Sequence, residues 1–389
     1  LQSISNIITE TSLSDWKIYF KWALLNRNAS LLNSEFEKQN FYFYRTVLSG
    51  VEELEPRWKR GVSVVSGRLG EIIGKVYVEK HFDQKAKNRM LELVENLREA
   101  YRISIEELDW MGDSTKVQAQ EKLKKFRPKV GFPNEWKDYS NLVISKDDLI
   151  GNIKNSTLDR TIKNREKLGK PIDREEWGMT PQTVNAYYSP LLNEIVFPAG
   201  ILQPPFFNME ADDAVNYGAI GAVIGHEMGH GFDDKGSKYD GNGELRNWWT
   251  ESDRKQFEER TKKLIDQYNG YTVVDGTPVN GEFTQGENIG DLAGIVIAYK
   301  AYQLSKKGSK APIIDGLTGD QRFFFGWATI WGSKSTDEQL IRQIKTDPHS
   351  PGEFRANGPL VSMPEFVNLY NVKPGDGMYI DPNDRVKIW

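Results

Sequence analysis

Cysteine is missing altogether from the 389-residue sequence. A disulfide framework is therefore excluded, and a zinc ion cannot be held by thiolates. The compartment stays open, because a chain without cysteine is compatible with the cytoplasm and with an oxidising compartment alike.

Long apolar runs are also missing, and no segment approaches the roughly 18 residues that a membrane-spanning helix needs. The first residues, LQSIS, contain no initiator methionine, no basic segment and no long apolar segment of a signal peptide. We therefore expect no transmembrane segment in this chain. We also expect that the chain starts after a preceding part has been removed.

An excess of positive charge is the third absence. The formal net charge is −4, so the sequence lacks the strong positive field that is typical of a nucleic-acid-binding protein. The locally basic run at residues 116–129 is interpreted as the solvated face of a helix. Charged residues make up 27% of the sequence and hydrophobic residues 38%, which is typical of a globular protein, and the length permits two domains.

Residues 1–150 carry apolar side chains at helical spacing and predict a helical region. The clearest stripe consists of Met90, Leu93, Val94, Leu97, Tyr101, Ile105 and Leu108. We expect helices over residues 15–25, 34–48, 58–76, 84–108 and 114–126. Residues 152–177 are strongly charged and are interpreted as a helix and a linker. His81 is assigned a capping or surface role.

After residue 177 the pattern changes to extended chain. Two β-prone runs, at residues 184–188 and 194–197, are joined by the turn-like sequence SPLLN, which predicts a hairpin. The edge of such a hairpin could bind a peptide as an additional strand through main-chain hydrogen bonds. An ordinary sheet edge is the alternative that the sequence leaves open.

Residues 223–234 contain the motif H-E-x-x-H, formed by His226, Glu227 and His230. A helix turns by about 100° per residue, so the two histidines lie on one face, where both imidazoles can bind one metal ion. Glu227 is displaced around the helix and can reach a water on the metal without being a ligand, which makes it a candidate general base. Asp212 and Asp213 offer an N-cap for this helix.

A second helix is predicted where Glu287 and Asp291 stand four residues apart at the edge of an apolar run. Two carboxylates at the edge of a buried helix are costly unless a positive charge faces them, and a zinc ion would supply that charge. Glu287 could be a third ligand, and Asp291 could hydrogen-bond the second nitrogen of a histidine ligand. Spacing alone does not decide between Glu287 and Glu282. Asp233 is a weaker candidate for the supporting role and could instead cap the first helix.

A proline-rich loop at residues 345–355 carries His349 and, six residues later, Arg355. Loops on a rigid scaffold often present functional side chains. A histidine in a loop is by default a surface group, however, so the residues alone leave both roles open for His349.

These blocks resemble the neprilysin and endothelin-converting-enzyme family of zinc endopeptidases, including its bacterial oligopeptidase members. The matches are NAY at residues 185–187, FPAGILQPPFF at 197–207, the metal motif at 223–234, GENIGD at 286–291, HSPG at 349–352 with Phe354 and Arg355, and the terminal Trp389. They follow the family's order over residues 185–389. The helical half is similar through GRLG at residues 67–70 and LDWM at residues 108–111.

The resemblance implies a zinc site. Its ligands would be His226, His230 and Glu287, with one zinc ion per chain. Glu227 would be the base, and Asp291 would support a ligand.

The resemblance also implies how a substrate is held. His349 would stabilise the transition state, and Arg355 would hold a main-chain carbonyl of the substrate. Asn185 and the backbone of Ala186 would hydrogen-bond the substrate strand. The pocket for the side chain just after the cut, which favours large hydrophobic residues in this family, would be lined by Phe206, Val223, Ile330 and Trp331.

The chain departs from the family pattern in two details and in length. Gly290 stands where the family has alanine, and no cysteine precedes Trp389 as it does in animal members; both details are similar to bacterial members. The N-terminal portion of the family is missing, and we expect that a partner chain supplies it or that processing has removed it. A periplasmic, cell-surface or secreted location is favoured, with the cytoplasm left open.

We therefore predict a mainly α fold with a small β-sheet (α+β). Residues 151–389 would form a gluzincin, thermolysin-like catalytic domain, and residues 1–150 part of a helical cap that admits short, flexible peptides. The predicted activity is zinc-dependent hydrolysis of oligopeptides on the amino side of large hydrophobic residues. The alternative is a zinc-stabilised module that binds peptides without cutting them, although a structural zinc site would not need the base Glu227.

Overall fold

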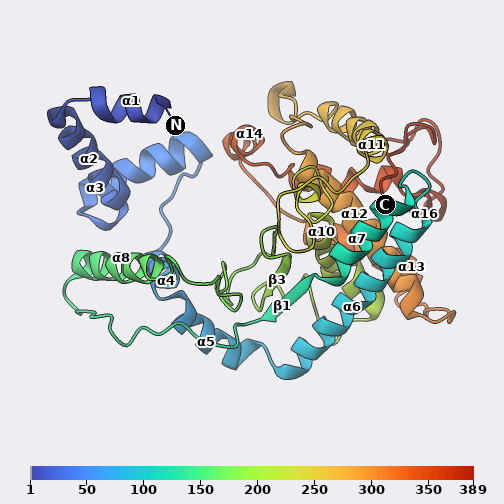
Figure 1. Ribbon diagram of the computed structural model, residues 1–389, viewed down its shortest axis with the longest axis horizontal. Helices are drawn as coiled ribbons and strands as arrows, with labels where there is room; N and C mark the ends of the chain where they lie inside the picture. The colour runs from blue at the N-terminus through green and yellow to red at the C-terminus, as the bar shows by residue number, and fades with distance from the viewer. Residues whose placement is uncertain (1) are drawn as a thin grey trace. The chain divides into compact units, whose positions relative to one another are not determined.

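The computed structural model describes residues 2–389 and is mainly helical, with one small sheet (Figure 1). The chain divides into two compact units. The first comprises Leu1–Val64, Tyr139–Lys170 and Ser335–Arg342, and the second comprises Val65–Asp138, Pro171–Lys334 and Gln343–Trp389. The units alternate along the chain, and the expected domain boundary at residue 150 stays a prediction.

The first unit is built from helices. Ser12 caps α2 by accepting a hydrogen bond from the Asp15 N–H, and Asp148 caps α8 by accepting one from the Gly151 N–H. The helices of this unit are α1 (Gln2–Glu10), α2 (Leu13–Asn28), α3 (Ser34–Phe41), the π-helix Tyr42–Val47, α8 (Leu149–Arg165), and the first parts of α4 (Arg57–Arg68) and α14 (Asp337–Thr346). The helices predicted over residues 15–25 and 34–48 are confirmed in position, the second with a π-helical end.

The first unit has little core of its own. None of the described residues of α1 to α4 is buried. Phe20 and Trp22 of α2 are each 60% exposed, and Trp58 of α4 is 67% exposed. These helices therefore carry a broad exposed apolar surface.

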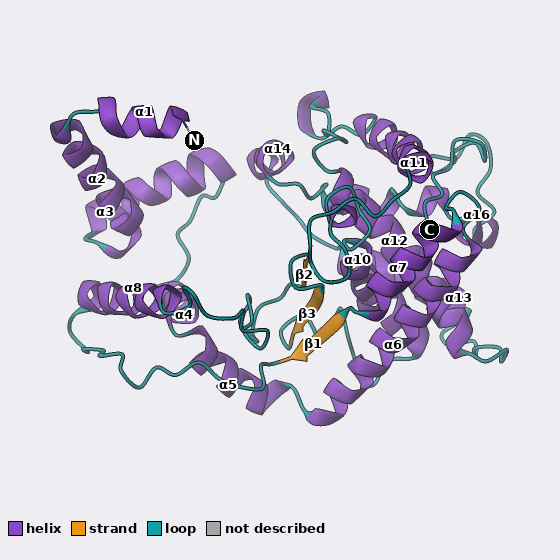
Figure 2. Ribbon diagram, in the orientation of Figure 1, coloured by secondary structure: helices purple, strands orange, loops and turns teal. Residues whose placement is uncertain are grey.

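The sheet belongs to the second unit and has the strand order β1-β3-β2 (Figure 2). β3 (Glu194–Pro198) is the central strand, and every one of its residues is buried. β2 (Tyr187–Ser189) pairs with it antiparallel, which confirms the predicted hairpin. β1 (Arg127–Gly131) pairs with it in parallel, with Arg127 opposite Glu194.

The interpretation of residues 116–129 as one solvated helix face is wrong. The helix α7 (Asp113–Lys124) ends within this run, and β1 begins three residues later. Lys122 is 1% exposed and Lys129 is 6% exposed. Lys129 tolerates this burial because its Nζ lies 2.7 Å from Oε2 of Glu194 on the central strand.

Two further helices precede β1 in the second unit. α5 (Gly70–His81) follows α4 after a break at Leu69, so the single helix predicted over residues 58–76 is wrong. α6 (Gln84–Glu107) agrees with the prediction for residues 84–108 and buries the predicted stripe. Asp83 begins α6 by accepting a hydrogen bond from the Ala86 N–H.

The helices α10 (Ala222–Gly229) and α12 (Gln285–Ser305) pack main chain against main chain. A Cβ on Gly225 would lie 2.8 Å from the Gly294 oxygen, and a Cβ on Gly294 would lie 2.5 Å from the Ala222 oxygen. Only glycine permits so close an approach at both positions. α10 is preceded by α9 (Asp213–Asn216), which Asp212 caps, and by the π-helix Tyr217–Gly221.

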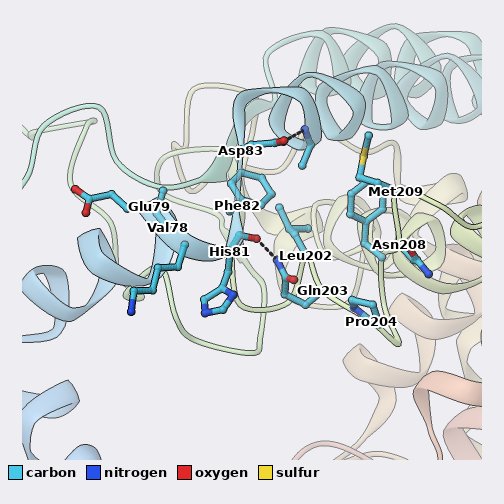
Figure 3. Close-up of a pocket in the computed structure, with 13 residues that line it drawn as sticks. Val78, Glu79, His81, Phe82, Asp83, Leu202, Gln203, Pro204, Asn208 and Met209 are labelled. Carbon is cyan, nitrogen blue, oxygen red and sulfur yellow. Dashed lines mark hydrogen bonds between the residues drawn. The ribbon is translucent and has the colours of Figure 1, made fainter.

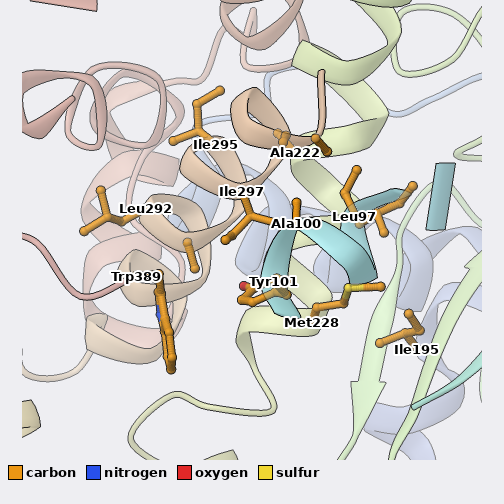
Figure 4. Packing of buried hydrophobic residues seen from close by; sticks show 14 of the residues in the cluster. Leu97, Ala100, Tyr101, Ile195, Ala222, Met228, Leu292, Ile295, Ile297 and Trp389 are labelled. Atoms are coloured by element: carbon orange, nitrogen blue, oxygen red, sulfur yellow. The ribbon is translucent and has the colours of Figure 1, made fainter. Parts of the chain in front are cut away.

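The core of the second unit surrounds these two helices (Figure 4). Leu97 and Tyr101 of α6, Met228 of α10, Leu292 of α12 and Trp389 belong to one buried cluster. The Tyr101 hydroxyl donates to the Gly225 oxygen at 2.9 Å, so α6 also holds α10 by a buried hydrogen bond.

The remaining helices complete the second unit. α13 begins with a capping box in which Thr318 and Gln321 satisfy each other's backbone N–H groups. These helices are α11 (Glu251–Asn269), α13 (Gly319–Ile330), α15 (Gly352–Asn357) and α16 (Pro364–Leu369). Within residues 2–389, no helix combines the length and apolar character that crossing a bilayer requires.

Candidate metal centre and active site

Three side chains of the second unit can hold one metal ion. His226 lies on α10, His230 caps its C-terminus and Glu287 lies on the first turn of α12, and a ligand atom from each falls within 4.8 Å of the others. Oε2 of Glu287 is 3.2 Å from Nε2 of His226 and 3.7 Å from Nε2 of His230. Ligands about 2.1 Å from a tetrahedral zinc ion lie about 3.4 Å apart, so this spacing suits zinc. Glu282 is exposed and outside the group, which leaves Glu287 as the third member.

The surroundings of this group favour a positive charge. Burial lowers the pKa of His226, but the interactions with Asp291 and Glu287 outweigh it and raise that pKa to about 10. Burial raises the pKa of Glu287, but the nearby His226 and His349 hold it far below its usual range. Oε2 of Glu287 is buried and accepts no well-directed hydrogen bond within the described part of the chain. A cation at this point would satisfy that oxygen.

A carboxylate orients each histidine through its second ring nitrogen. Oδ1 of Asp291 is 2.9 Å from Nδ1 of His226, and Oδ2 of Asp233 is 2.8 Å from Nδ1 of His230. Asp291 is 1% exposed and Asp233 is 4% exposed. Contacts of this kind fix the tautomer and direct Nε2 towards a metal. Asp233, the weaker candidate in the sequence, therefore occupies the same position at His230 as Asp291 does at His226.

Glu227 is the buried acid beside the two histidines. It is 6% exposed. Burial raises the pKa of Glu227, and the charges of His226 and His230 oppose this shift. A carboxylate with a raised pKa is a stronger proton acceptor, which suits a general base.

Arg355 and Asp291 form a two-pronged ion pair next to the metal group. Nε of Arg355 is 2.8 Å from Oδ2 of Asp291, and Nη2 is 2.7 Å from Oδ1. The guanidinium lies 4.2 Å from the ring centroid of Trp331, which caps the end of α13. Burial raises the pKa of Asp291, but Arg355 outweighs it and keeps the carboxylate ionised. Two predicted substrate-binding residues, Arg355 and Trp331, are thus held together beside the ligands.

The loop histidine also lies at the metal group. Nε2 of His349 is 3.1 Å from Oε2 of Glu287, and Nδ1 is 2.6 Å from Oδ1 of Asp347. The interaction with Glu287 is the main reason that the pKa of His349 is raised. The side chain is 42% exposed, so a substrate can reach it. Asp347, which the sequence did not single out, orients this histidine.

A buried hydrogen-bond chain joins the His349 loop to α12. Ser350 Oγ donates to Oδ1 of Asn288 at 2.9 Å, and Nδ2 of Asn288 donates to Thr284 Oγ1 at 2.9 Å. Asn288 and Ser350 directly follow Glu287 and His349 in the sequence, so these hydrogen bonds connect the two segments that carry Glu287 and His349. The sequence contained a signal for this contact, because Asn288 and Ser350 each lie inside a motif block and next to a predicted site residue.

The predicted substrate-binding residues lie around the same helices. Val223 stands one turn before His226 on α10, Ile330 ends α13 next to Trp331, and both are half-buried. Phe206 is half-buried, and its carbonyl accepts from the Ile220 N–H at 2.9 Å in the π-helix that leads into α10. Their roles in recognition remain predictions.

The predicted substrate edge directly precedes β2, a strand that packs against α10. Asn185 is exposed, and its Oδ1 accepts from the N–H of the buried Ala186 at 2.9 Å. β2 is an edge strand of the sheet, so the backbone beside it is placed where a peptide could add as a strand.

A separate pocket of about 560 Å³ lies at His81, between the end of α5, the start of α6 and residues 202–209 (Figure 3). Nε2 of Gln203 donates to the His81 oxygen at 2.8 Å across this pocket. The lining contains no member of the metal group. His81 therefore lies apart from the other three histidines.

Comparison with known proteins gives two family matches, both described as Peptidase family M13. One covers residues 1–133 and the other covers residues 185–386, which include the metal group. Neprilysin-11 of Caenorhabditis elegans is 38% identical over 405 residues, and endothelin-converting enzyme 1 of Mus musculus is 36% identical over 404 residues. Each match covers 100% of this chain but only 47% and 52% of the respective relative. The chain thus spans about half the length of these curated relatives.

Solved structures of two proteins are also similar to this chain. The zinc metalloprotease Zmp1 of Mycobacterium tuberculosis, crystallised with an inhibitor, has a TM-score of 0.96 and 51% identity, covering 100% of this chain and 59% of that one. PepO from Lactobacillus rhamnosis has a TM-score of 0.90 and 32% identity, covering 99% of this chain and 60% of that one.

Proposed function

Because the chain belongs to peptidase family M13, with the mainly helical gluzincin fold of that family, we propose that it carries the catalytic residues of a zinc metalloendopeptidase that hydrolyses oligopeptides. One observation carries this proposal. α10 and α12 bring His226, His230 and Glu287 to one point, with the buried acid Glu227 beside them. A purely structural zinc site would not need such an acid.

The metal and the side chains of the protein would contribute different steps of the reaction. Zinc bound at this site would lower the pKa of a water molecule and polarise a peptide carbonyl. Glu227 accepts the proton of the attacking water, and it later delivers a proton to the leaving amine. Its burial supports both steps, because a raised pKa lets the carboxylate take up and hold a proton.

Three further groups hold the substrate. His349 donates from Nε2 to the oxygen that becomes negative in the transition state, with Asp347 holding its Nδ1. Arg355 uses Nε and Nη2 for Asp291, and we assign its Nη1 to a main-chain carbonyl of the substrate. Asn185 and the backbone of Ala186 pair with the substrate as a strand.

We also propose that cleavage occurs on the amino side of large hydrophobic residues. The four residues assigned to that pocket are half-buried apolar side chains on elements that adjoin the metal group: Phe206, Val223, Ile330 and Trp331. An apolar pocket of this kind gains free energy from a large hydrophobic side chain, at roughly 25 cal/mol per Å² removed from water.

The first unit supports a proposal about a partner. Its helices expose wide apolar surfaces, and the relatives are about twice as long as this chain. We propose that polypeptide corresponding to the rest of the relatives covers these helices, either as a partner chain or as a part lost by processing. We also propose that residues 1–150 form part of a helical cap domain and residues 151–389 the catalytic domain. On the resemblance alone, we also propose a periplasmic, cell-surface or secreted location.

The proposed activity can be tested with a mixed library of short peptides. The zinc-loaded chain is incubated with the library, alone and together with the polypeptide that completes the first unit, and products are identified by mass spectrometry. We expect new N-termini that begin with large hydrophobic residues. A protein that binds the peptides with zinc but releases them intact in both arms would instead be a binding module, and the hydrolysis proposal would fail.

Replacement of His349 by alanine tests the transition-state role. Loss of one such hydrogen-bond donor costs about 2.7–4 kcal/mol of barrier in known hydrolases, so kcat should fall on the order of a hundredfold or more. KM and zinc content should change little, because His349 is not one of the three proposed ligands. His81→Ala is the matched control, since it removes a histidine outside the metal group, and it should keep the parent kcat. Parent-like turnover of His349→Ala would remove this assignment.

A further inference from the structure

Lys122 is a lysine that the proposed mechanism does not use, and burial lowers its pKa to about 7 against the opposing charges of Asp233 and Asp240. It lies near the end of α7 and is 1% exposed. Its Nζ donates to three backbone oxygens, those of Gly231 at 2.6 Å, Gly236 at 2.8 Å and Tyr239 at 2.7 Å. An ammonium group has three N–H donors, so this contact set uses all of them on one segment.

That segment, the 231–239 loop, directly follows the ligand His230. It contains Asp233, which contacts Nδ1 of His230 at 2.8 Å. The other carboxylate oxygen of Asp233 accepts from the N–H groups of Lys235 at 2.8 Å and Gly236 at 2.6 Å. The loop thus folds around Asp233 on one side and around Lys122 on the other, and Gly236 is shared by both contacts.

The loop has little freedom once these contacts are made. A Cβ on Gly236 would lie 1.7 Å from the His230 oxygen, so the returning chain touches the ligand's own backbone. Without the ammonium, the Gly231 oxygen would lose the one donor that it has within the described residues, whereas the oxygens of Gly236 and Tyr239 would keep only the Tyr239 N–H and the Trp248 Nε1–H. The loop would have to move to rehydrate the Gly231 oxygen. Any such movement displaces Asp233 and, with it, the ring of His230.

We propose that Lys122 is a positioning residue for the metal site: by holding the 231–239 loop, it keeps Asp233 against Nδ1 of His230 and so directs Nε2 of that histidine at the zinc ion. Lys122 touches neither metal nor substrate. It acts through the loop and through Asp233. The proposal rests on zinc binding at the proposed site and is independent of peptide hydrolysis.

The alternative is that Lys122 only stabilises the fold. A measurement of zinc affinity distinguishes this role from positioning of the metal site. Lys122→Met has a similar length and no donor, so it removes all three contacts. We expect its zinc affinity, measured by competition with a chromophoric chelator, to fall about tenfold, at the lower end of the 10–100-fold losses known for residues behind a ligand. The rise in Tm on adding zinc should be smaller than in the parent, because stabilisation by a ligand depends on its affinity.

Lys125→Met is the matched control. Lys125 follows α7 directly and is exposed, and its Nζ donates to Oδ1 of Asn242 at 2.8 Å. It should keep the parent zinc affinity and the parent rise in Tm with zinc. If Lys122→Met does not fold, Lys122→Gln, which keeps two N–H donors at a shorter reach, is measured instead.

A double-mutant cycle with Asp233→Asn tests the route of the effect. If Lys122 acts through Asp233, its replacement should change zinc affinity much less in the Asp233→Asn background than in the parent. A Lys122 variant that folds with lower metal-free Tm but with the parent zinc affinity would overturn the proposal and leave a purely structural role. Full additivity with Asp233→Asn would overturn the proposed route.

Discussion

Glu227→Gln is expected to lower kcat by about 10²–10⁴, because it removes the group that takes and returns the proton in the proposed reaction. Glutamine has nearly the same shape but cannot accept a proton at neutral pH. KM and zinc affinity should stay close to those of the parent, since Glu227 is not among the three proposed ligands. The measurement is turnover of a peptide that the parent cuts, at equal zinc content.

The same variant has an expected effect on stability that checks the burial of Glu227. Burial raises the pKa of this acid above its value in the unfolded chain, so the ionised form destabilises the metal-free fold at pH values above the unfolded pKa. Replacement by neutral glutamine should therefore leave the metal-free Tm unchanged or higher at pH 7. A variant that keeps parent-like turnover would mean that another group is the base.

Glu287→Ala should abolish tight zinc binding. It removes one of three proposed ligands and the oxygen that lies close to both histidines. Removal of residues behind a ligand already costs 10–100-fold in affinity, so removal of the ligand itself should cost more than about a hundredfold. Peptide hydrolysis should be lost with the metal. Zinc affinity is measured by chelator competition and metal content after gel filtration.

Glu282→Ala is the matched control for this experiment. Glu282 lies five residues earlier, is exposed, and competed with Glu287 for the ligand role on spacing alone. Its replacement should leave zinc affinity and turnover unchanged. If the two variants behaved in the opposite way, the third ligand would be Glu282 and the position of α12 relative to α10 would need revision.

The spacing of apolar residues predicted most of the helices. It did not predict elements whose structure depends on contacts with distant parts of the sequence. α6 was predicted over almost its full length because its buried stripe repeats with the period of a helix. β1 was missed because its residues Arg127 and Lys129 do not look like a buried strand. They are accommodated by Glu194 on a strand that lies far away in the sequence, and a partner at that distance leaves no local signal.

The site residues that lie at helical spacing within a motif were predictable. The residues that act through a loop were not. His226 and His230 follow from the spacing of four residues, whereas the choice of Glu287 over Glu282 needed either the family resemblance or the packed helices. Asp347 and Lys122 were not predicted, because each acts through a loop whose path is set by tertiary contacts. Lys122 in particular looks like any other lysine of a basic run.

Main-chain contact at Gly225 and Gly294 joins α10 and α12 into one rigid body. The three proposed ligands His226, His230 and Glu287 are therefore expected to move together. Movements elsewhere in the molecule would leave the proposed ligand set intact, and separation of the ligands would require local unfolding of these helices. Metal exchange would then be much slower than peptide turnover, so that the zinc ion would serve as a permanent component through many cycles.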